Sequence, residues 1–242
     1  MEGVNLELKD LKPAIQLSSL SIDYHEFVRS FSHPLGKLVP VKGLEEINLS
    51  IPKGQNTAII GKNGAGKSTL IKAISGHLRP SQGIIKISGK TITLAGVNPG
   101  FQVNFSPNWN VRNLGVAYGV SRQNIEQFTA EVETFADIGE AFYRQFRGLS
   151  SGMRGKVGFG FITALKPDIL LIDETLGVGD IEFRKKARLR LERFIDRSGT
   201  VLISTHSLGL AKEMCSHGIL IENGKLINYG KISEIIDEYV KT

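Results

Sequence analysis

A glycine-rich stretch before a lysine constrains this chain more than any other part of its sequence. Residues 61–69 read Gly-Lys-Asn-Gly-Ala-Gly-Lys-Ser-Thr and follow the apolar run Thr57–Ile60. They match the phosphate-binding P-loop pattern GxxxxGK[ST], which has this meaning only between a buried strand and a helix. The sequence therefore predicts a strand, a phosphate-binding loop and a helix in succession.

Each residue type in this loop has a physical role. The three glycines permit positive φ, so successive backbone N–H groups can form a concave nest for an anion. The positive end of the following helix adds to that field. Lys67 is expected to reach the β- and γ-phosphates, and Ser68 to be a ligand of Mg²⁺. The alternative is a turn that binds nothing, which the full pattern disfavours. The predicted nucleotide-binding residues here are Gly61, Asn63, Gly64, Ala65, Gly66, Lys67, Ser68 and Thr69.

Length and composition favour one α/β domain. The chain has 242 residues, of which 41% are hydrophobic. We find no apolar run near the roughly 20 residues that span a bilayer, and no signal-peptide segment, so we expect a cytoplasmic protein. The single cysteine, Cys215, excludes an internal disulfide. The net charge of +6 favours an acidic partner, either nucleic acid or an anionic membrane surface.

The segments around the P-loop show strand patterns. Residues 15–24 predict an edge strand that ends at Tyr24, whose ring either stacks on a nucleotide base or simply packs at the strand end. Residues 25–43 contain prolines, glycines and two histidines and predict a long loop. Leu44–Ile51 and Ile84–Ile87 predict two further strands.

The middle of the chain changes character. Residues 95–110 are rich in glycine, asparagine and proline and predict a functional loop. A helical period returns over 122–136, and a further helix is expected to begin near Ser150. We interpret 110–165 as a helical subdomain inserted into the core.

Two buried strands then end in polar residues. Ile169–Ile172 is apolar on both faces, as a central parallel strand must be, and Asp173 and Glu174 follow it. Such carboxyl ends of strands carry the ligand sites of α/β sheets. We expect Asp173 to hold Mg²⁺ and Glu174 to orient or polarise an attacking water. His206 follows the strand Thr200–Ser204 and is either a donor to the γ-phosphate or a structural residue.

The last part of the chain predicts two helices and a hairpin. Residues 182–197 form a basic helix, which is either a solvated face or a surface for membrane or nucleic acid. Asn223-Gly224 predicts the turn of a hairpin over 218–229, and an amphipathic helix begins at Ile232.

With these motifs placed, the chain resembles the ATP-binding subunits of ABC transporters over nearly its whole length. Leu149-Ser-Ser-Gly-Met153 is similar to the family signature LSGGQ. The resemblance implies that Ser150, Ser151 and Gly152 bind the γ-phosphate held by the opposite subunit of a head-to-tail dimer. Ser151 stands where the family usually has its first glycine; if that position needs φ > 0, the serine is strained by about 1 kcal/mol or more. Met153 replaces the glutamine.

One branch of that family is particularly similar, the exporters of bacterial capsular polysaccharide, O-antigen and teichoic acid. The similarity rests on Ser-Ser-Gly-Met, on Pro99-Gly-Phe-Gln102 and on Val178-Gly-Asp180. It implies that Gln102 contacts Mg²⁺ and water, that Asp180 crosses the dimer and that Tyr24 stacks on adenine. The implied catalytic residues are Lys67, Gln102, Glu174 and His206, and the implied metal ligands are Ser68, Gln102 and Asp173.

The resemblance also implies the architecture. The expected fold is α/β, a P-loop NTPase of ABC ATPase type, with a mainly parallel core sheet, an antiparallel β subdomain and an inserted helical subdomain. One domain would cover 1–242. Residues 1–94 and 166–242 would form the β subdomain and the RecA-like core, and 95–165 the Q-loop and helical subdomain. We expect no carbohydrate-binding domain after His206.

The implied function is ATP- and Mg²⁺-dependent export of surface polysaccharide. Two copies would form a homodimer beneath separate transmembrane permease subunits, peripheral on the cytoplasmic face of the membrane. The complex would handle a lipid-linked polysaccharide and no nucleic acid. The alternatives are export of another cargo, such as lipid or drug, and a soluble ABC ATPase of DNA repair or translation. A GTPase is disfavoured because the sequence lacks an Asn-Lys-x-Asp element.

Overall fold

The structure divides the chain into two compact units. The computed structural model describes residues 13–30, 33–94, 99–173, 181–196 and 199–241. Met1–Thr91 and Thr200–Thr242 form the first unit, and Ile92–Gly199 forms the second. The finer predicted division, with 95–165 as a separate subdomain, stays a prediction.

The first unit contains the predicted parallel core. Its strands lie in the order β7-β3-β8-β9, and β3 runs parallel to both β7 and β8. The β8–β9 pair is antiparallel, which confirms the predicted hairpin. Thr57 to Ile60 are buried, and β3 has a neighbouring strand on each side. The bounds are β3 (Asn56–Ile60), β7 (Thr200–Ser204), β8 (His217–Glu222) and β9 (Lys225–Lys231).

Three helices belong to the same unit. They are α1 (Lys67–Ile74), α6 (Leu208–Met214) and α7 (Ile232–Lys241). Helix α1 follows β3 and the P-loop directly, as the sequence predicts. Gly76 has φ +79° just beyond the end of α1, which confirms its expected place as a left-handed stop residue. In α7, Ile232 and Ile235 are buried, as the amphipathic pattern predicts.

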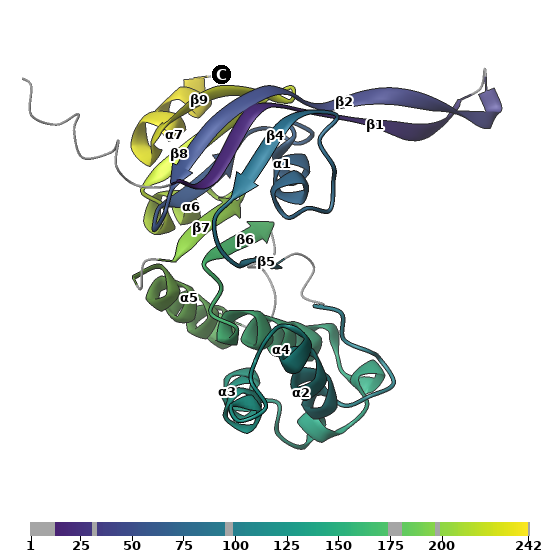
Figure 1. Ribbon diagram of the computed structural model, residues 1–242, viewed down its shortest axis with the longest axis vertical. Helices are drawn as coiled ribbons and strands as arrows, with labels where there is room; N and C mark the ends of the chain where they lie inside the picture. The colour runs from purple at the N-terminus through teal and green to yellow at the C-terminus, as the bar shows by residue number, and fades with distance from the viewer. Residues whose placement is uncertain (1–12, 31–32, 95–98, 174–180, 197–198, 242) are drawn as a thin grey trace, which may run out of the picture. The chain divides into compact units, whose positions relative to one another are not determined.

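A three-stranded sheet completes the unit and confirms the predicted antiparallel β subdomain. Its order is β2-β1-β4, with β1 (Pro13–Ser30), β2 (His33–Pro52) and β4 (Gln82–Ile87). Two expectations for this region were wrong. Strand β1 is central and continues past Tyr24. The described residues of 25–43, which were predicted as a loop, lie in the paired strands β1 and β2. In Figure 1, β1 and β2 run out beyond α1 as a long two-stranded ribbon.

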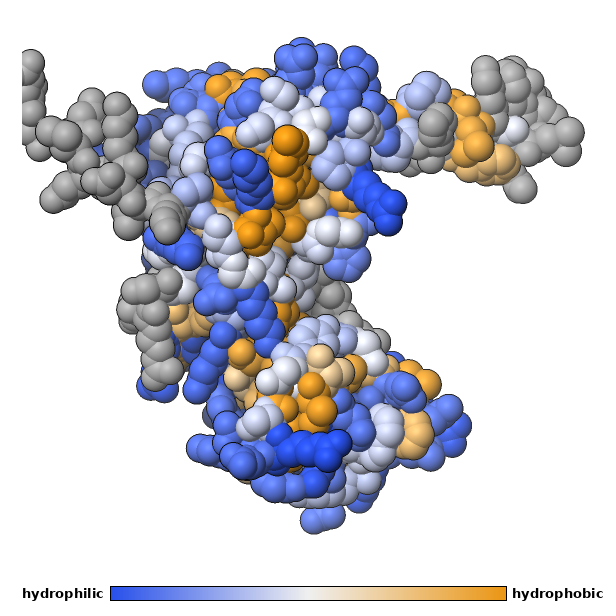
Figure 2. Space-filling view, viewed as in Figure 1, coloured by the Kyte–Doolittle hydropathy of each residue, from blue (hydrophilic) through white to orange (hydrophobic). Residues whose placement is uncertain are grey.

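The ribbon tolerates its loop-like residues for two reasons. Strand β2 lies at the edge of the sheet, where Pro34 and Pro40 interrupt no second ladder. Gly36 has φ +83°, and a Cβ built on it would lie 2.0 Å from the Phe27 ring, so the aromatic ring covers this glycine. Phe27 and Leu38 are opposite each other in the ladder and more than half exposed, which gives the ribbon an apolar surface (Figure 2).

The second unit is mainly helical. Its longest elements include two predicted helices, α3 and α4, and the predicted basic helix α5. Helix α2 was missed, because the predicted loop ran on to residue 110. Ser106 caps α2 by accepting a hydrogen bond from the N–H of Trp109 at 3.2 Å, and Pro107 takes the first helical position. The bounds are β5 (Thr91–Leu94), α2 (Pro107–Ala117), α3 (Ile125–Ala136), η1 (Gly139–Tyr143), η2 (Phe146–Gly148), α4 (Ser151–Ala164), β6 (Ile169–Asp173) and α5 (Ile181–Asp196).

Basic side chains of α5 interact within this unit. Arg190 forms an ion pair with Glu131, and its guanidinium lies 4.5 Å from the centroid of the Phe135 ring. Arg188 Nε lies 2.9 Å from Glu192 Oε1 on the same helix. Arg188 and Arg190 are thus engaged within the unit, and the choice between a solvated face and a surface for membrane or nucleic acid stays a prediction. Among the described residues, we find no helix that is long and apolar enough to cross a membrane.

Candidate nucleotide site

The side chain of Lys67 is hydrogen-bonded to backbone carbonyls of the P-loop. The side chain of Lys67 is only 6% exposed, and its Nζ donates to the carbonyl of Gly61 at 2.8 Å and of Lys62 at 3.0 Å. The residue before it, Gly66, begins α1 with φ 111° and has no side chain that could cap the first-turn N–H groups. Ammonium and helix N-terminus are therefore concentrated at one loop, which is the arrangement that attracts a phosphate.

The glycines of the loop are required for different reasons. A Cβ on Gly61 would lie 2.3 Å from the carbonyl oxygen of Ile221, so the loop leaves β3 only because this side chain is absent. Gly64 has φ +78°, and apart from its two chain neighbours no atom of the described residues lies within 4 Å of a Cβ built there. The backbone of Gly64 therefore faces open space. A concave backbone with an open side and a buried lysine fits a nucleotide phosphate chain.

The turn between β8 and β9 is hydrogen-bonded to the backbone of the P-loop. The N–H of Gly224 donates to the carbonyl of Ala65 at 2.9 Å, and the carbonyl of Gly224 accepts from the N–H of Glu45 at 2.8 Å. Asn223 and Gly224 both have positive φ, as the predicted tight turn requires. The turn signal is visible in the sequence, but its contact with Ala65 joins residues far apart in the chain and could not be predicted.

Tyr24 lies beside the P-loop helix. Its side chain is 38% exposed. A Cβ built on Gly43 would lie 2.7 Å from Tyr24 Cε1 and 3.0 Å from Thr69 Cγ2, so ring and helix flank the same glycine. The structure thus brings Tyr24 to the loop that the sequence assigned to phosphate. Its stacking role stays a prediction.

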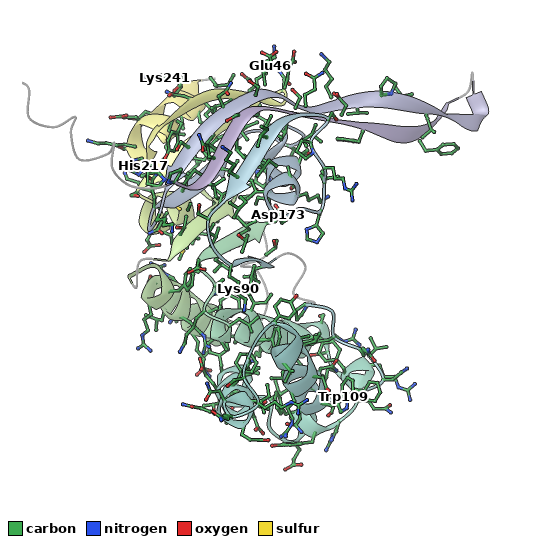
Figure 3. All side chains as sticks on the ribbon, in the orientation of Figure 1. Glu46, Lys90, Trp109, Asp173, His217 and Lys241 are labelled. Atoms are coloured by element: carbon green, nitrogen blue, oxygen red, sulfur yellow. The ribbon has the colours of Figure 1, made fainter. Side chains whose placement is uncertain are left out.

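The polar residues after the core strands are placed only in part. His206 is exposed between β7 and α6, whose first turn is capped by Ser207. Asp173 ends β6 and is half-buried (Figure 3). Glu174 and Asp180 lie outside the described residues. The catalytic and metal-binding roles of these four residues stay predictions.

The signature segment begins a helix, as predicted. Ser150 is the N-cap of α4, and its Oγ accepts from the N–H of Met153 at 3.2 Å. Ser151 is the first residue of that helix and is not among the residues with positive φ. The condition for strain at Ser151, a positive φ, is therefore not met, and a right-handed first turn accepts a serine without penalty. A Cβ built on Gly152 would lie 3.9 Å from Ser150 Oγ, which is an ordinary van der Waals distance.

A family model gives the identification. Residues 44–177, which include the P-loop, the signature and the Asp-Glu strand, match the model described as ABC transporter. The chain belongs to the ABC transporter family.

Relatives within the ABC transporter family include O-antigen export ATP-binding proteins. The chain is 30% identical to one from Klebsiella pneumoniae, over 95% of this chain and 98% of that protein. It is 37% identical to one from Myxococcus xanthus, over 82% of this chain and 46% of that protein. A teichoic acids export ATP-binding protein of Bacillus anthracis is 34% identical, over 81% of this chain and 36% of that protein. The chain thus spans less than half the length of the last two relatives.

Solved structures support the ABC fold. An ATP-binding cassette solved as a dimer in a post-hydrolysis state with ADP and Pi has a TM-score of 0.73 and 20% identity, covering 90% of this chain and 98% of that one. An ATP-binding subunit of an ABC transporter has a TM-score of 0.77 and 22% identity, over 94% and 93%. The predicted fold class is confirmed.

This ABC transporter family member holds its candidate Q-loop with an asparagine that the sequence analysis missed. Asn110 is fully buried in α2. Its Oδ1 accepts from the N–H of Gln102 at 2.7 Å, and its Nδ2 donates to the carbonyls of Gln102 at 2.9 Å and Ser106 at 3.0 Å. One amide therefore fixes the backbone from 102 to 106 while leaving the Gln102 side chain exposed. The Ser106-Pro107 helix start was the available sequence signal, because it places residue 110 in the first turns of a helix.

Replacing Asn110 by alanine is expected to destabilise the fold by about 1 to 2 kcal/mol, because the part-buried N–H and carbonyl of Gln102 lose their side-chain partner. Urea unfolding of wild type and variant measures the difference. Asn113→Ala is the matched control, since Asn113 is exposed on the same helix and makes one bond, to the carbonyl of Trp109. Equal stability of the two variants would contradict the role of Asn110.

Proposed function

We propose that this chain is the ATP-binding and ATP-hydrolysing subunit of an exporter that drives bacterial surface polysaccharide across the cytoplasmic membrane. The cargo would be of O-antigen, capsule or teichoic acid type. The observation that carries the proposal is the P-loop with Lys67 held over its carbonyls, in a chain whose relatives are named for O-antigen and teichoic acid export.

The first unit provides the nucleotide-binding residues. The P-loop amides and Lys67 would bind the β- and γ-phosphates, and Tyr24 would stack on the base. Ser68, Gln102 and Asp173 are the proposed ligands of Mg²⁺. When bound, Mg²⁺ supplies positive charge that neutralises the phosphate oxygens.

Hydrolysis would proceed by positioning and electrostatic stabilisation. Glu174 orients a water whose oxygen bonds to the γ-phosphorus as the bond to the β–γ bridging oxygen breaks. Lys67 offsets the charge that develops on the leaving phosphate. His206 donates a hydrogen bond to the γ-phosphate and so distinguishes ATP from ADP.

The signature would complete the site of a second copy. Ser150 and the N-terminus of α4 present a hydroxyl and N–H groups, which suit a γ-phosphate. Gly152 has no side chain that would hinder close approach of a ligand. A head-to-tail homodimer would place two ATP molecules between the chains, with Asp180 crossing the interface. The dimeric state of the similar cassette structure supports this arrangement.

An apolar surface of the second unit suits the permease. Phe105 and Trp109 stack at 3.9 Å between ring centroids and are 40% and 38% exposed. Val103 and Val116 are 47% and 44% exposed. Figure 3 labels Trp109 on this unit. We propose that two permease subunits bind here, which would hold the chain on the cytoplasmic face of the membrane.

Capture of the native complex tests the assignment. The tagged chain is purified from its own membranes in mild detergent, and mass spectrometry identifies the bound proteins and lipids. We expect a transmembrane permease and an isoprenoid-linked glycan. A permease loaded with another lipid or a drug would overturn the cargo, and a nucleic-acid complex without a permease would overturn the exporter itself.

A further inference from the structure

Gly43 is an extra residue in the ladder between β1 and β2. Ile22 pairs with Leu44 and Asp23 pairs with Lys42, so the register shifts at this point and Gly43 is left between the two pairs. Such a bulge bends a strand locally and changes the direction of nearby side chains. On β1, Tyr24 is the second residue after this shift and is paired with Val41.

The missing side chain of Gly43 leaves room for the Tyr24 ring. Gly43 is buried, and a Cβ there would lie 2.7 Å from Tyr24 Cε1, 3.0 Å from Thr69 Cγ2 and 3.3 Å from the carbonyl of Ile22. A separation under 3.0 Å is not tolerated by carbon atoms, so one group would have to move. Thr69 lies in α1 and the Ile22 carbonyl is backbone, whereas Tyr24 is 38% exposed and its ring end is the group that can shift toward solvent.

The backbone of Gly43 reaches the P-loop on its other side. A Cβ on Gly66 would lie 3.0 Å from the Gly43 carbonyl oxygen, and one on Gly224 would lie 2.9 Å from it. Gly224 in turn binds Ala65 of the P-loop through its N–H. The same glycine therefore contacts the ring proposed to bind the base and the loop proposed to bind the phosphates.

We propose that Gly43 is a positioning residue of the nucleotide site, which sets the position of the Tyr24 ring relative to the P-loop. The inference rests on the proposed stacking of Tyr24 on the base. Gly43 would act through Tyr24 and would not touch the nucleotide itself.

The variant Gly43→Ala, which adds one methyl group, tests this positioning role. Gly43 does not have positive φ, so alanine introduces no backbone strain, and it restricts the unfolded chain more than glycine does. The fold should therefore survive the change. Gly230→Ala is the matched control, because Gly230 also lies in a strand of this unit and its Cβ would meet Glu234 Oε2 at an ordinary 3.4 Å.

The experiment measures binding of two probes by calorimetry in the full chain, Mg²⁺ with a non-hydrolysable ATP analogue and Mg²⁺ with inorganic tripolyphosphate. Gly43→Ala is expected to weaken the ATP analogue about tenfold, since base stacking on an aromatic ring supplies an effect of this size. Tripolyphosphate has no base, so its affinity should stay within about twofold, and thermal unfolding should resemble that of Gly230→Ala. Adding Gly43→Ala to Tyr24→Ala should cause no further loss.

Each other outcome overturns a defined step. Normal affinity for the ATP analogue in Tyr24→Ala would remove the stacking role and this inference with it. Weak binding in Tyr24→Ala but normal binding in Gly43→Ala would overturn the inference alone. Equal losses for both probes, or losses that multiply in the double variant, would show that Gly43 acts through the P-loop and not through Tyr24.

Discussion

Replacing Glu174 by glutamine is expected to lower ATP turnover about a hundredfold to a thousandfold while leaving ATP binding intact. In the sequence, Glu174 comes directly after Asp173, the last residue of the buried strand β6. Glutamine keeps the shape of the side chain but cannot polarise a water molecule as a carboxylate does. ATP should then hold two chains together, because the step that separates them is blocked.

Phosphate release measures the turnover, and light scattering after size exclusion measures the dimer with ATP and without it. Glu140→Gln is a suitable control, since Glu140 is an exposed carboxylate of the second unit. Normal turnover in Glu174→Gln would remove the residue from its assigned role. Loss of turnover without an ATP-dependent dimer would argue against the head-to-tail arrangement.

Lys67→Ala is expected to weaken ATP binding about a hundredfold or more. The variant loses the charge-assisted hydrogen bond from the ammonium to the phosphates, and also its hydrogen bonds to the P-loop carbonyls. The buried ammonium is bonded to the carbonyls of Gly61 and Lys62, so its removal also leaves those carbonyls without this donor. Calorimetry with the ATP analogue measures the affinity, and thermal unfolding measures any effect on the fold.

Two further variants separate the loss of the contact with phosphate from the loss of hydrogen bonds within the loop. Lys72→Ala removes an exposed lysine from the same helix and should bind ATP normally. Lys67→Gln retains an N–H donor without the charge, so it should unfold nearer to wild type than Lys67→Ala and still bind ATP poorly. Unchanged affinity in Lys67→Ala would contradict the assignment of the P-loop to phosphate.

Local chemistry explains which elements could be predicted. The strand, loop and helix over Asn56–Ile74 follow from an apolar run, glycines with positive φ and a stop at Gly76. The start of α4 was predictable because Ser150 can cap a helix with its own side chain.

The sequence by itself determined the phosphate loop, the buried parallel strands and the family, since these depend on residues close together in the chain. Only the tertiary structure decided that the proline-containing segment after Tyr24 is strand, because its partner strand supplies the hydrogen bonds that its own sequence does not specify. Likewise, the contacts of Gly43 with Tyr24, Thr69 and Gly224 join three distant segments. A pairing between distant segments depends on the free energy of the whole fold, and no local pattern encodes it.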